Sequence, residues 1–249
     1  EMVRSRVDSI GSRAARQILE RAAVLGASFS YPLLRSMLEE EDDEGLVHNC
    51  DAAITDLVSA GILREEGEAH EDLLAFDHGL MRDVVRREID RPMPWRPLHR
   101  AAARAKRSFW SERIEDHSLE IANHFAEAKD HQGQCQFLAR AAQSAARGSE
   151  PSRAVELFRR ALEIRRRLDD TETEFSSEVP TASRLQLDLG HLMRRVNEYD
   201  EAREHYRAVL DSDDLVSVAR ARWGLGLVAE HQGTSKPMGR MANTIVRSS

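Results

Sequence analysis

The stretch LGHLMRRVNEYDEAREHYRAVL, residues 189–210, shows the helical pattern of this protein most clearly. Apolar residues recur along it at helical spacing, and Asn197–Glu198 interrupts the pattern where a tight turn belongs. Ala202 follows Gly190 by twelve residues, and Tyr206 follows Ala202 by four. Small residues let two helix axes approach closely, and large ones fill the groove beside them. The stretch therefore predicts two helices packed antiparallel.

The same spacing of small and large residues recurs in other parts of the chain. The segment SRAVELFRRALEI (152–164) repeats it, and Leu225–Gly226 lies 36 residues after Leu189–Gly190. A pattern that recurs at a fixed distance predicts stacked helical hairpins, with two unrelated hairpins in an ordinary bundle as the alternative. The predicted repeat core consists of Ala154, Phe158, Leu162, Leu189, Gly190, Ala202, Tyr206, Leu210, Leu225 and Gly226.

This pattern resembles the tetratricopeptide repeat, a helix pair with a period of about 34 residues. The resemblance implies an α-solenoid whose concave face, lined by first helices such as 182–196, binds a protein or peptide. The step from Ala154 to Ala202 is 48 residues, and we expect the excess to be a loop or a helix extension within 167–183. The tail does not complete a further repeat, because Met238 and Ala242 occupy the places of an alanine and an aromatic residue.

The composition predicts a mostly α-helical fold class with a small β-hairpin. Of the 249 residues, 41% are apolar, 32% are charged and only 5% are aromatic, a profile typical of helix-rich proteins. The sequence lacks an apolar run of the roughly 18 residues that a membrane span needs, and residues 1–13 lack a signal-peptide core. The lone cysteines Cys50 and Cys135 favour a reducing compartment, so we expect a cytoplasmic protein. Because the chain begins with Glu1, we expect it to be part of a longer protein.

Residues 1–92 predict a different kind of module. Its expected elements are helices at 12–26, 30–39, 44–61 and 78–89, and a hairpin formed by 62–63 and 73–76. Three helices followed by a hairpin are typical of a winged-helix module. Beyond it we expect linking helices over 93–131, the repeat array over 132–233 and an atypical tail over 234–249.

The charge of this module bears on DNA binding. Residues 12–90 contain 8 Arg, no Lys and 18 Asp plus Glu, a net charge of −10, whereas residues 91–107 carry six basic residues and no acid. The third predicted helix, which would enter a major groove, carries Glu44, Asp51 and Asp56 and no Lys or Arg. Duplex DNA binds through basic side chains that displace its counterions. Nucleic acid is therefore not an expected partner, and a DNA-binding transcription regulator is the alternative function.

Several strings in this order resemble a family of regulatory proteins. RAAVLGASFSYPLLRSML, LVSAGILREE and FDHGLMRDVV, followed by LHRAAARA and helical repeats, are similar to the region downstream of the nucleotide-binding domain in bacterial signal-transduction ATPases with numerous domains. The resemblance covers about residues 1–233. It implies that the winged helix packs on an adjacent ATPase domain and that the repeats form a sensor or partner-binding arm. The chain has no G-x-x-x-x-G-K-[ST] phosphate loop, so we expect ATP or ADP only with the missing domain, and no enzymatic activity.

One string carries a candidate nucleotide contact. FDHGLMRD (76–83) resembles the Met-His-Asp motif of nucleotide-switch ATPases, which implies that His78 contacts the ADP β-phosphate, with Arg82 as a second sensor candidate. A helix start favours anions, and an imidazole can donate to phosphate. Gly79 replaces the acid of the motif. The alternative is that His78 begins the helix and bonds locally.

The other candidate sites have weaker support in the sequence. His117, His124 and His131 recur every seven residues, too far apart along a helix to share a metal, so we expect surface positions and no metal site. No arrangement of Ser, His and Asp predicts a catalytic nucleophile. A basic row in the linking helix could touch phosphate, but a solvated face is the expected role of Arg96, Arg100, Arg104, Lys106 and Arg107.

Overall fold

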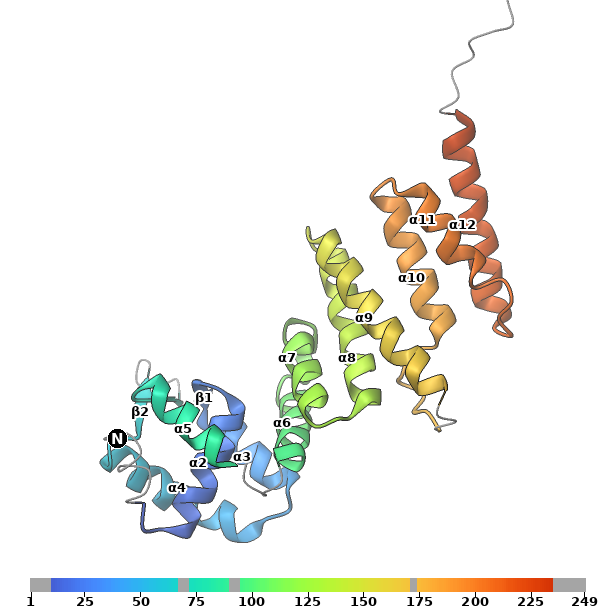
Figure 1. Ribbon diagram of the computed structural model, residues 1–249. Helices are drawn as coiled ribbons and strands as arrows, with labels where there is room; N and C mark the ends of the chain where they lie inside the picture. The colour runs from blue at the N-terminus through green and yellow to red at the C-terminus, as the bar shows by residue number, and fades with distance from the viewer. Residues whose placement is uncertain (1–9, 67–71, 90–94, 171–173, 235–249) are drawn as a thin grey trace, which may run out of the picture. The chain divides into compact units, whose positions relative to one another are not determined.

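The computed structural model describes residues 10–66, 72–89, 95–170 and 174–234 (Figure 1). Helices account for most of these residues, which confirms the predicted mostly α-helical fold class. The chain divides into two compact units, one ending at Ala141 and the other beginning at Ala142.

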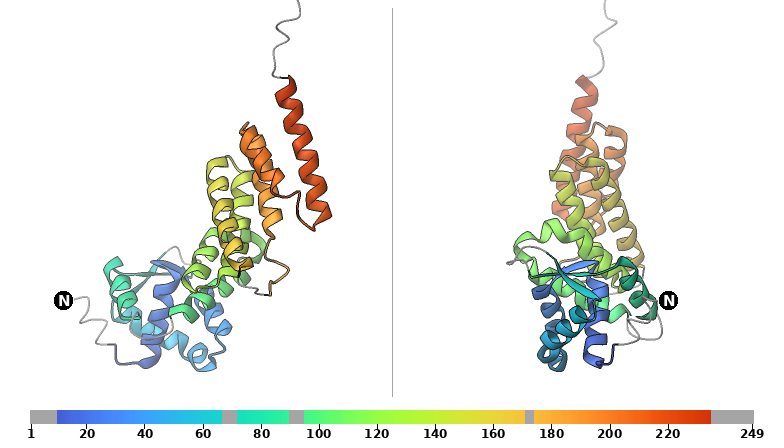
Figure 2. Two further views of the ribbon diagram at one scale, coloured as in Figure 1. Left: turned by 45° about the vertical axis from the view of Figure 1, so that its right-hand side comes forward. Right: turned by 90° about the vertical axis from the view of Figure 1, so that its left-hand side faces the viewer.

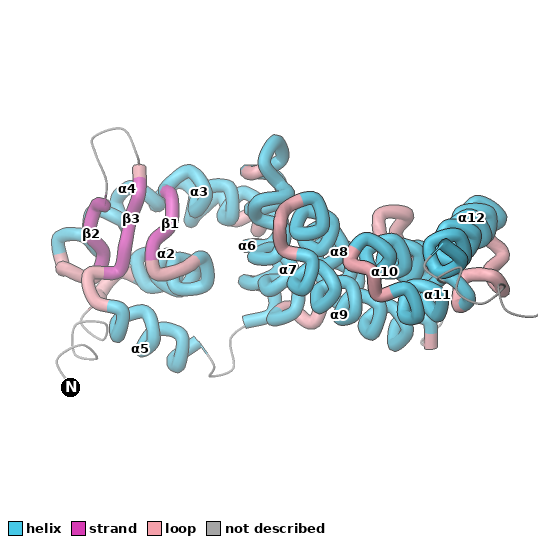
Figure 3. The backbone as a smooth tube through the Cα atoms, turned by 90° about the horizontal axis from the view of Figure 1, so that it is seen from above, coloured by secondary structure: helices cyan, strands magenta, loops and turns pink. Residues whose placement is uncertain are grey.

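The first unit opens with helices around a small sheet. Its elements follow in the order α2 (Arg13–Leu25), β1 (Ser28–Ser30), α3 (Tyr31–Glu40), α4 (Glu44–Ser59), β2 (Leu63–Glu66), β3 (Leu73–Phe76) and α5 (Gly79–Ile89). The predicted hairpin is present, because β2 pairs antiparallel with β3, and Leu63 lies opposite Phe76. Strand β1 pairs with the other edge of β3, which gives the order β1–β3–β2 (Figure 3). Sequence reasoning missed β1, since three residues are too short to show an alternating pattern.

Local signals set the ends of these helices. The side chain of Ser12 accepts a hydrogen bond from the Ala15 amide at the start of α2. Gly61 follows α4 with φ of 63°, a left-handed conformation that glycine adopts at little cost. There the amide of Ile62 donates to the carbonyl of Leu57 at 3.0 Å, which closes the helix and turns the chain toward β2.

The apolar core of the first unit extends beyond the predicted boundary at residue 92. Leu98, Ala101, Ala102 and Ala105 of α6 (Trp95–Phe109) are buried in the same core as α2 to α5. Because α6 presents small residues to the module, it packs against α2 and α3 instead of acting only as a linker. The unit continues with η1 (Ser111–Arg113), α7 (Ile114–Glu127) and the first part of α8 (His131–Arg147).

Gly133 lies inside α8, which begins at His131, and not in the turn that precedes this helix. A methyl group built on Gly133 would lie 2.7 Å from the ring of Phe125. The glycine therefore serves close packing within the helix pair, not the turn.

The second unit contains the stretch on which the fold prediction rests. Beyond the end of α8, its elements are α9 (Pro151–Asp169), α10 (Ala182–Arg195), α11 (Tyr199–Arg207) and α12 (Leu215–Thr234). Helix α10 packs against α9, α11 and α12, and the last of these is the long red helix of Figure 2. The predicted turn at Asn197–Glu198 is present: Asn197 has φ of 65°, and the Glu198 amide donates to the Met193 carbonyl at 2.9 Å. The excess within 167–183 is divided between a longer α9 and a loop.

Tyr206 occupies the centre of this helix packing. Its ring is fully buried, and a methyl group built on Gly190 would lie 2.7 Å from Cε1. A methyl group built on Gly224 of α12 would lie 2.5 Å from Cζ. The ring thus fits between two helices that approach closely because each has a glycine at that point.

The position of Gly224 corrects the predicted repeat core. Ala154, Phe158, Leu162, Leu189 and Ala202 are all buried. Gly226, however, is exposed with nothing near its missing side chain, and Leu225 and Leu210 are only partly buried. Val209 is fully buried in place of Leu210, because α11 ends at Arg207 and the chain turns there.

The corrected register makes the step between matching glycines 34 residues, from Gly190 to Gly224. Lys236 and Arg240 then stand in the places of Ala202 and Tyr206. Met238 and Ala242, which we compared with those residues, lie with them outside the described residues. A lysine and an arginine do not suit a close helix crossing, so the tail still departs from the pattern.

Candidate functional site

His78 lies in the bend between β3 and α5. Its side chain is 63% exposed, and its Nε2 lies 3.6 Å from a carboxylate oxygen of Asp77. Its carbonyl accepts a hydrogen bond from the Met81 amide at 2.8 Å, which is the local bonding of a helix start. The exposed imidazole is also open to a ligand, so both interpretations of His78 stay predictions.

Arg82, the second sensor candidate, holds helices together. Its Nε donates to the carbonyl of Ala23 at 3.0 Å and thereby joins α5 to α2. Burial lowers the pKa of Arg82, and the neighbouring Arg86 lowers it further. Since its Nε is committed to Ala23, Arg82 would offer a phosphate only its terminal nitrogens.

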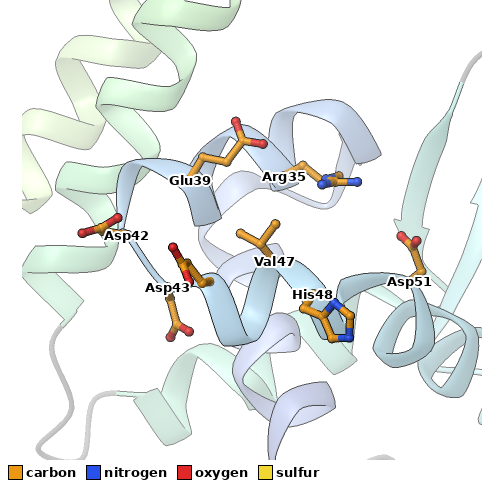
Figure 4. A pocket seen from close by; sticks show the side chains of 8 residues that line it. Arg35, Glu39, Asp42, Asp43, Val47, His48 and Asp51 are labelled. Atoms are coloured by element: carbon orange, nitrogen blue, oxygen red, sulfur yellow. The ribbon is translucent and has the colours of Figure 1, made fainter.

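The groove between α3 and α4 is acidic. It holds a cavity of about 680 Å³, which Figure 4 shows with Arg35 and His48 among its lining side chains. The acidic side chains that line it are Glu39, Asp42, Asp43, Glu44 and Asp51. Helix α4 carries no Lys or Arg, so this face repels phosphate. Glu68 and Glu71 of the predicted hairpin loop lie outside the described residues.

A buried histidine pair joins α6 to α7. Nδ1 of His99 lies 3.0 Å from Nδ1 of His124, and the two residues are 5% and 7% exposed. Burial lowers the pKa of His99 to about 4 and that of His124 to about 2. Both rings are therefore neutral at pH 7, with one nitrogen donating and the other accepting. Sequence reasoning missed this pair because its members are 25 residues apart.

The pair corrects one prediction. His131 is exposed as expected, but His124 is buried, and His117 stacks on Trp110 with ring centroids 3.6 Å apart. Within the described residues no group of three or more His, Cys, Asp or Glu side chains could hold a metal ion.

Lys106 connects three helices beside this pair. Its side chain is 1% exposed, its Nζ donates to the carbonyl of Leu25 at 3.3 Å, and it forms an ion pair with Glu120. The Trp110 ring lies 5.4 Å from Nζ. Burial lowers the pKa of Lys106, and Glu120 opposes that change. Lys106 thus joins the end of α2 to α6 and α7.

This placement corrects the prediction that the basic row of α6 is a solvated face. The exposed members of the row are Arg96, Arg104 and Arg107. Nε of Arg100 lies 3.8 Å from a carboxylate oxygen of Asp130. Lys106 instead points inward, because α6 packs on α2 and α7 along the side that carries it.

We expect Glu120→Ala to destabilise the protein more than Lys106→Met. The first change leaves a buried ammonium group without its counter-charge, which costs about 1–3 kcal/mol. The second keeps the apolar stem and returns Glu120 to solvent, so we expect a loss of less than about 1.5 kcal/mol. Urea unfolding followed by circular dichroism measures both, with the exposed Glu112→Ala as control. A larger loss for Lys106→Met would contradict this account.

Unpartnered polar atoms gather around Tyr206 in the second unit. Among the described residues, Oη of Tyr206, Nε2 of His191 and Nε of Arg194 are buried and make no close hydrogen bond. The side chain of Arg194 lies beside the Tyr206 hydroxyl and interacts with it. The His191 ring meets the Tyr206 ring edge-on, with centroids 5.5 Å apart. Native proteins satisfy most buried polar atoms, so three such atoms on the neighbouring helices α10 and α11 are unusual.

The last described helix exposes apolar side chains. Leu215, Val216 and Trp223 of α12 are 79%, 60% and 64% exposed. Val216 and Trp223 are seven residues apart, two helical turns, and therefore lie on one face. We call Val216 and Trp223 the α12 stripe. Buried positions such as Ala221 and Val228 face the other side, toward the second unit.

Comparison with known proteins found no matching family model, no similar curated protein and no similar solved structure. The described part of the chain contains no helix with the length and apolar character needed to span a membrane.

Proposed function

We propose that this chain is a non-enzymatic regulatory module that binds a protein or peptide through its helical repeats. The observation that carries the proposal is the α12 stripe, since exposed aromatic and aliphatic side chains on one helix face are typical of protein-binding surfaces. The glycine-to-glycine step of 34 residues and the ring of Tyr206 between two helices support a tetratricopeptide-type α-solenoid. Such arrays present extended binding surfaces.

The first unit supports the regulatory part of the proposal. Its element order and three-stranded antiparallel sheet support the assignment of a winged-helix module. The acidic groove on α4 argues against DNA as its partner, so we propose that it packs on a protein domain, namely the ATPase of a cytoplasmic, bacterial signal-transduction parent. Any ADP contact through His78 would then belong to that assembly and not to this chain alone.

Selection of a random peptide library on the purified chain tests the proposal. We expect selected peptides to lose at least about tenfold in affinity on Trp223→Ser, because a central aromatic residue contributes most of the energy of such contacts. Phe109→Ser is the matched control, since Phe109 is also an exposed aromatic residue but belongs to the first unit. Affinity is measured by fluorescence anisotropy.

Two results would count against the proposal. One is a selection that yields no peptide of measurable affinity. The other is a set of peptides that Trp223→Ser and Phe109→Ser affect equally.

A further inference from the structure

Helix α12 is apolar on both of its sides. One side packs against α10 and α11, and its buried residues there include Val218, Ala221 and Val228. The other side carries the α12 stripe and is exposed. Apolar residues thus occur all the way round the part of α12 between Leu215 and Ala229. A helix with that composition is normally covered on every side, so the exposed side is suited to a further helix.

The exposed side has a regular row of residues. Five exposed residues follow one another at alternating steps of three and four: Val216, Ala219, Trp223, Gly226 and Glu230. We call them the open row. That spacing is the heptad pattern by which two helices pack side chains into each other's gaps. Large side chains alternate in it with small ones, and nothing lies within 4 Å of a methyl group built on Gly226. The small residues therefore leave room for the large side chains of a second helix.

The open row is complementary to itself. Gly226 lies two residues after Gly224, about 200° further round the helix, so it faces away from Tyr206. When two copies of α12 run antiparallel about a twofold axis, Trp223 of each copy can lie over Gly226 of the other. A large side chain then meets a small residue twice in the same contact, as close helix packing requires.

The charges beside the row favour the same antiparallel pairing. Arg222 comes just before Trp223, and Glu230 comes seven residues after it. In the pairing just described, Glu230 of one copy lies within one turn of the other copy's Arg222. An in-register parallel pair would instead bring like charges together. Asp214 lies two turns before Arg222 and caps the start of α12 through the amide and the hydroxyl of Ser217, so it is not part of this pairing.

We propose that the protein bound by the α12 stripe is a second copy of this chain, docked antiparallel along the open row. This inference rests on the proposed function, because it names the partner of the same surface. The opposite charges of Arg222 and Glu230, together with the alternation of large and small residues, favour a second copy over an unrelated protein. Residues 216–230 span only about four helical turns, so the contact is small and the dimer weak, with a Kd in the micromolar range.

Analytical ultracentrifugation of the full chain between about 1 and 300 μM measures the dimer directly. We expect a monomer–dimer equilibrium whose Kd rises at least about tenfold in Trp223→Ser, since this side chain is the central aromatic contact. Gly226→Gln should raise the Kd as much, because the added side chain fills the place of the other copy's indole. This variant keeps its fold, since nothing lies near the missing side chain, and urea unfolding verifies its stability. Arg160→Gln, at an exposed position of α9, should leave the Kd within about twofold.

Exchange of the two charges tests the antiparallel pairing. Arg222→Glu and Glu230→Arg each bring like charges together across the pair, so each should raise the Kd by about threefold or more. The double variant restores opposite charges, and its Kd should return to within about twofold of the wild-type value. Within one helix the two residues are eight positions apart, too far for direct contact, so this recovery reports a contact between copies.

The outcomes separate this inference from the proposed function. A chain that stays monomeric at every concentration but binds selected peptides through Trp223 has a different partner, and the second copy is wrong. If the chain neither dimerises nor binds peptides, both proposals are wrong. A dimer that Trp223→Ser and Gly226→Gln leave intact uses another surface, and a double charge variant without recovery overturns the antiparallel pairing. A full chain that stays monomeric, while a chain ending at Thr234 dimerises, would assign the open row to residues 235–249 and overturn the second copy.

Discussion

Gly224→Ala is expected to destabilise the second unit by about 1–3 kcal/mol. The new methyl group would lie 2.5 Å from Cζ of Tyr206, well inside van der Waals contact. The ring cannot move away easily, because it is completely buried and Gly190 holds its other side. The loss is expected even though alanine is the better helix former by about 1 kcal/mol.

Gly226→Ala provides the matched control two residues further along the same helix. Nothing lies within 4 Å of a methyl group built there, so only the helix propensity changes. We expect this variant to gain up to about 1 kcal/mol. Urea unfolding followed by circular dichroism compares the two, and equal stabilities would show that α12 does not pack on Tyr206 through Gly224.

Acid is expected to destabilise the first unit through the His99–His124 pair. In the unfolded chain both imidazoles have pKa values near 6.5, whereas burial lowers them to about 4 and about 2 in the folded protein. The unfolded state therefore binds more protons below pH 6.5, and stability falls as the pH falls. Full stability is present above about pH 6.5, and at pH 4 His99 alone accounts for a loss of about 3 kcal/mol.

The cations that face the pair lower its pKa values in the same direction as burial does. Arg82, Arg86 and Lys106 lower the pKa of both imidazoles, whereas Glu127 raises that of His99. Charging either ring would place a further cation among them.

Tryptophan fluorescence measures the unfolding of this unit in a Trp223→Phe background. The chain has three tryptophans, and this change leaves only Trp95 and Trp110, which both belong to the first unit. In that background we expect the double variant His99→Gln, His124→Gln to lose much less stability than the wild-type pair between pH 6.5 and 4. The control variant His131→Gln changes an exposed histidine, so its stability should depend on pH as that of the wild-type protein does. A double variant with an unchanged pH dependence would show that other groups cause the acid sensitivity.

The sequence alone determined the helix content, the hairpin and the turn at Asn197, because these depend on residues close together in the chain. Periodicity marks a helix face, and a left-handed residue such as Asn197 or Gly61 marks its end. The predicted core residues Ala154, Phe158 and Ala202 are buried for the same local reason. Repeat spacing also placed Tyr206 among residues that fill the groove between helices.

Tertiary structure decided which glycine faces Tyr206, how far α6 joins the first core, and which polar groups are enclosed. Gly224 and Gly226 both lie close to the position that the repeat spacing predicts for the packing glycine. Only the contact with the buried ring of Tyr206 identifies Gly224 as that glycine. His99 and His124, or Lys106 and the carbonyl of Leu25, are far apart in sequence, and no local periodicity records their meeting. Burial and pairing are properties of the packed helices, so the buried polar atoms of His191, Arg194 and Tyr206 are apparent only in the folded chain.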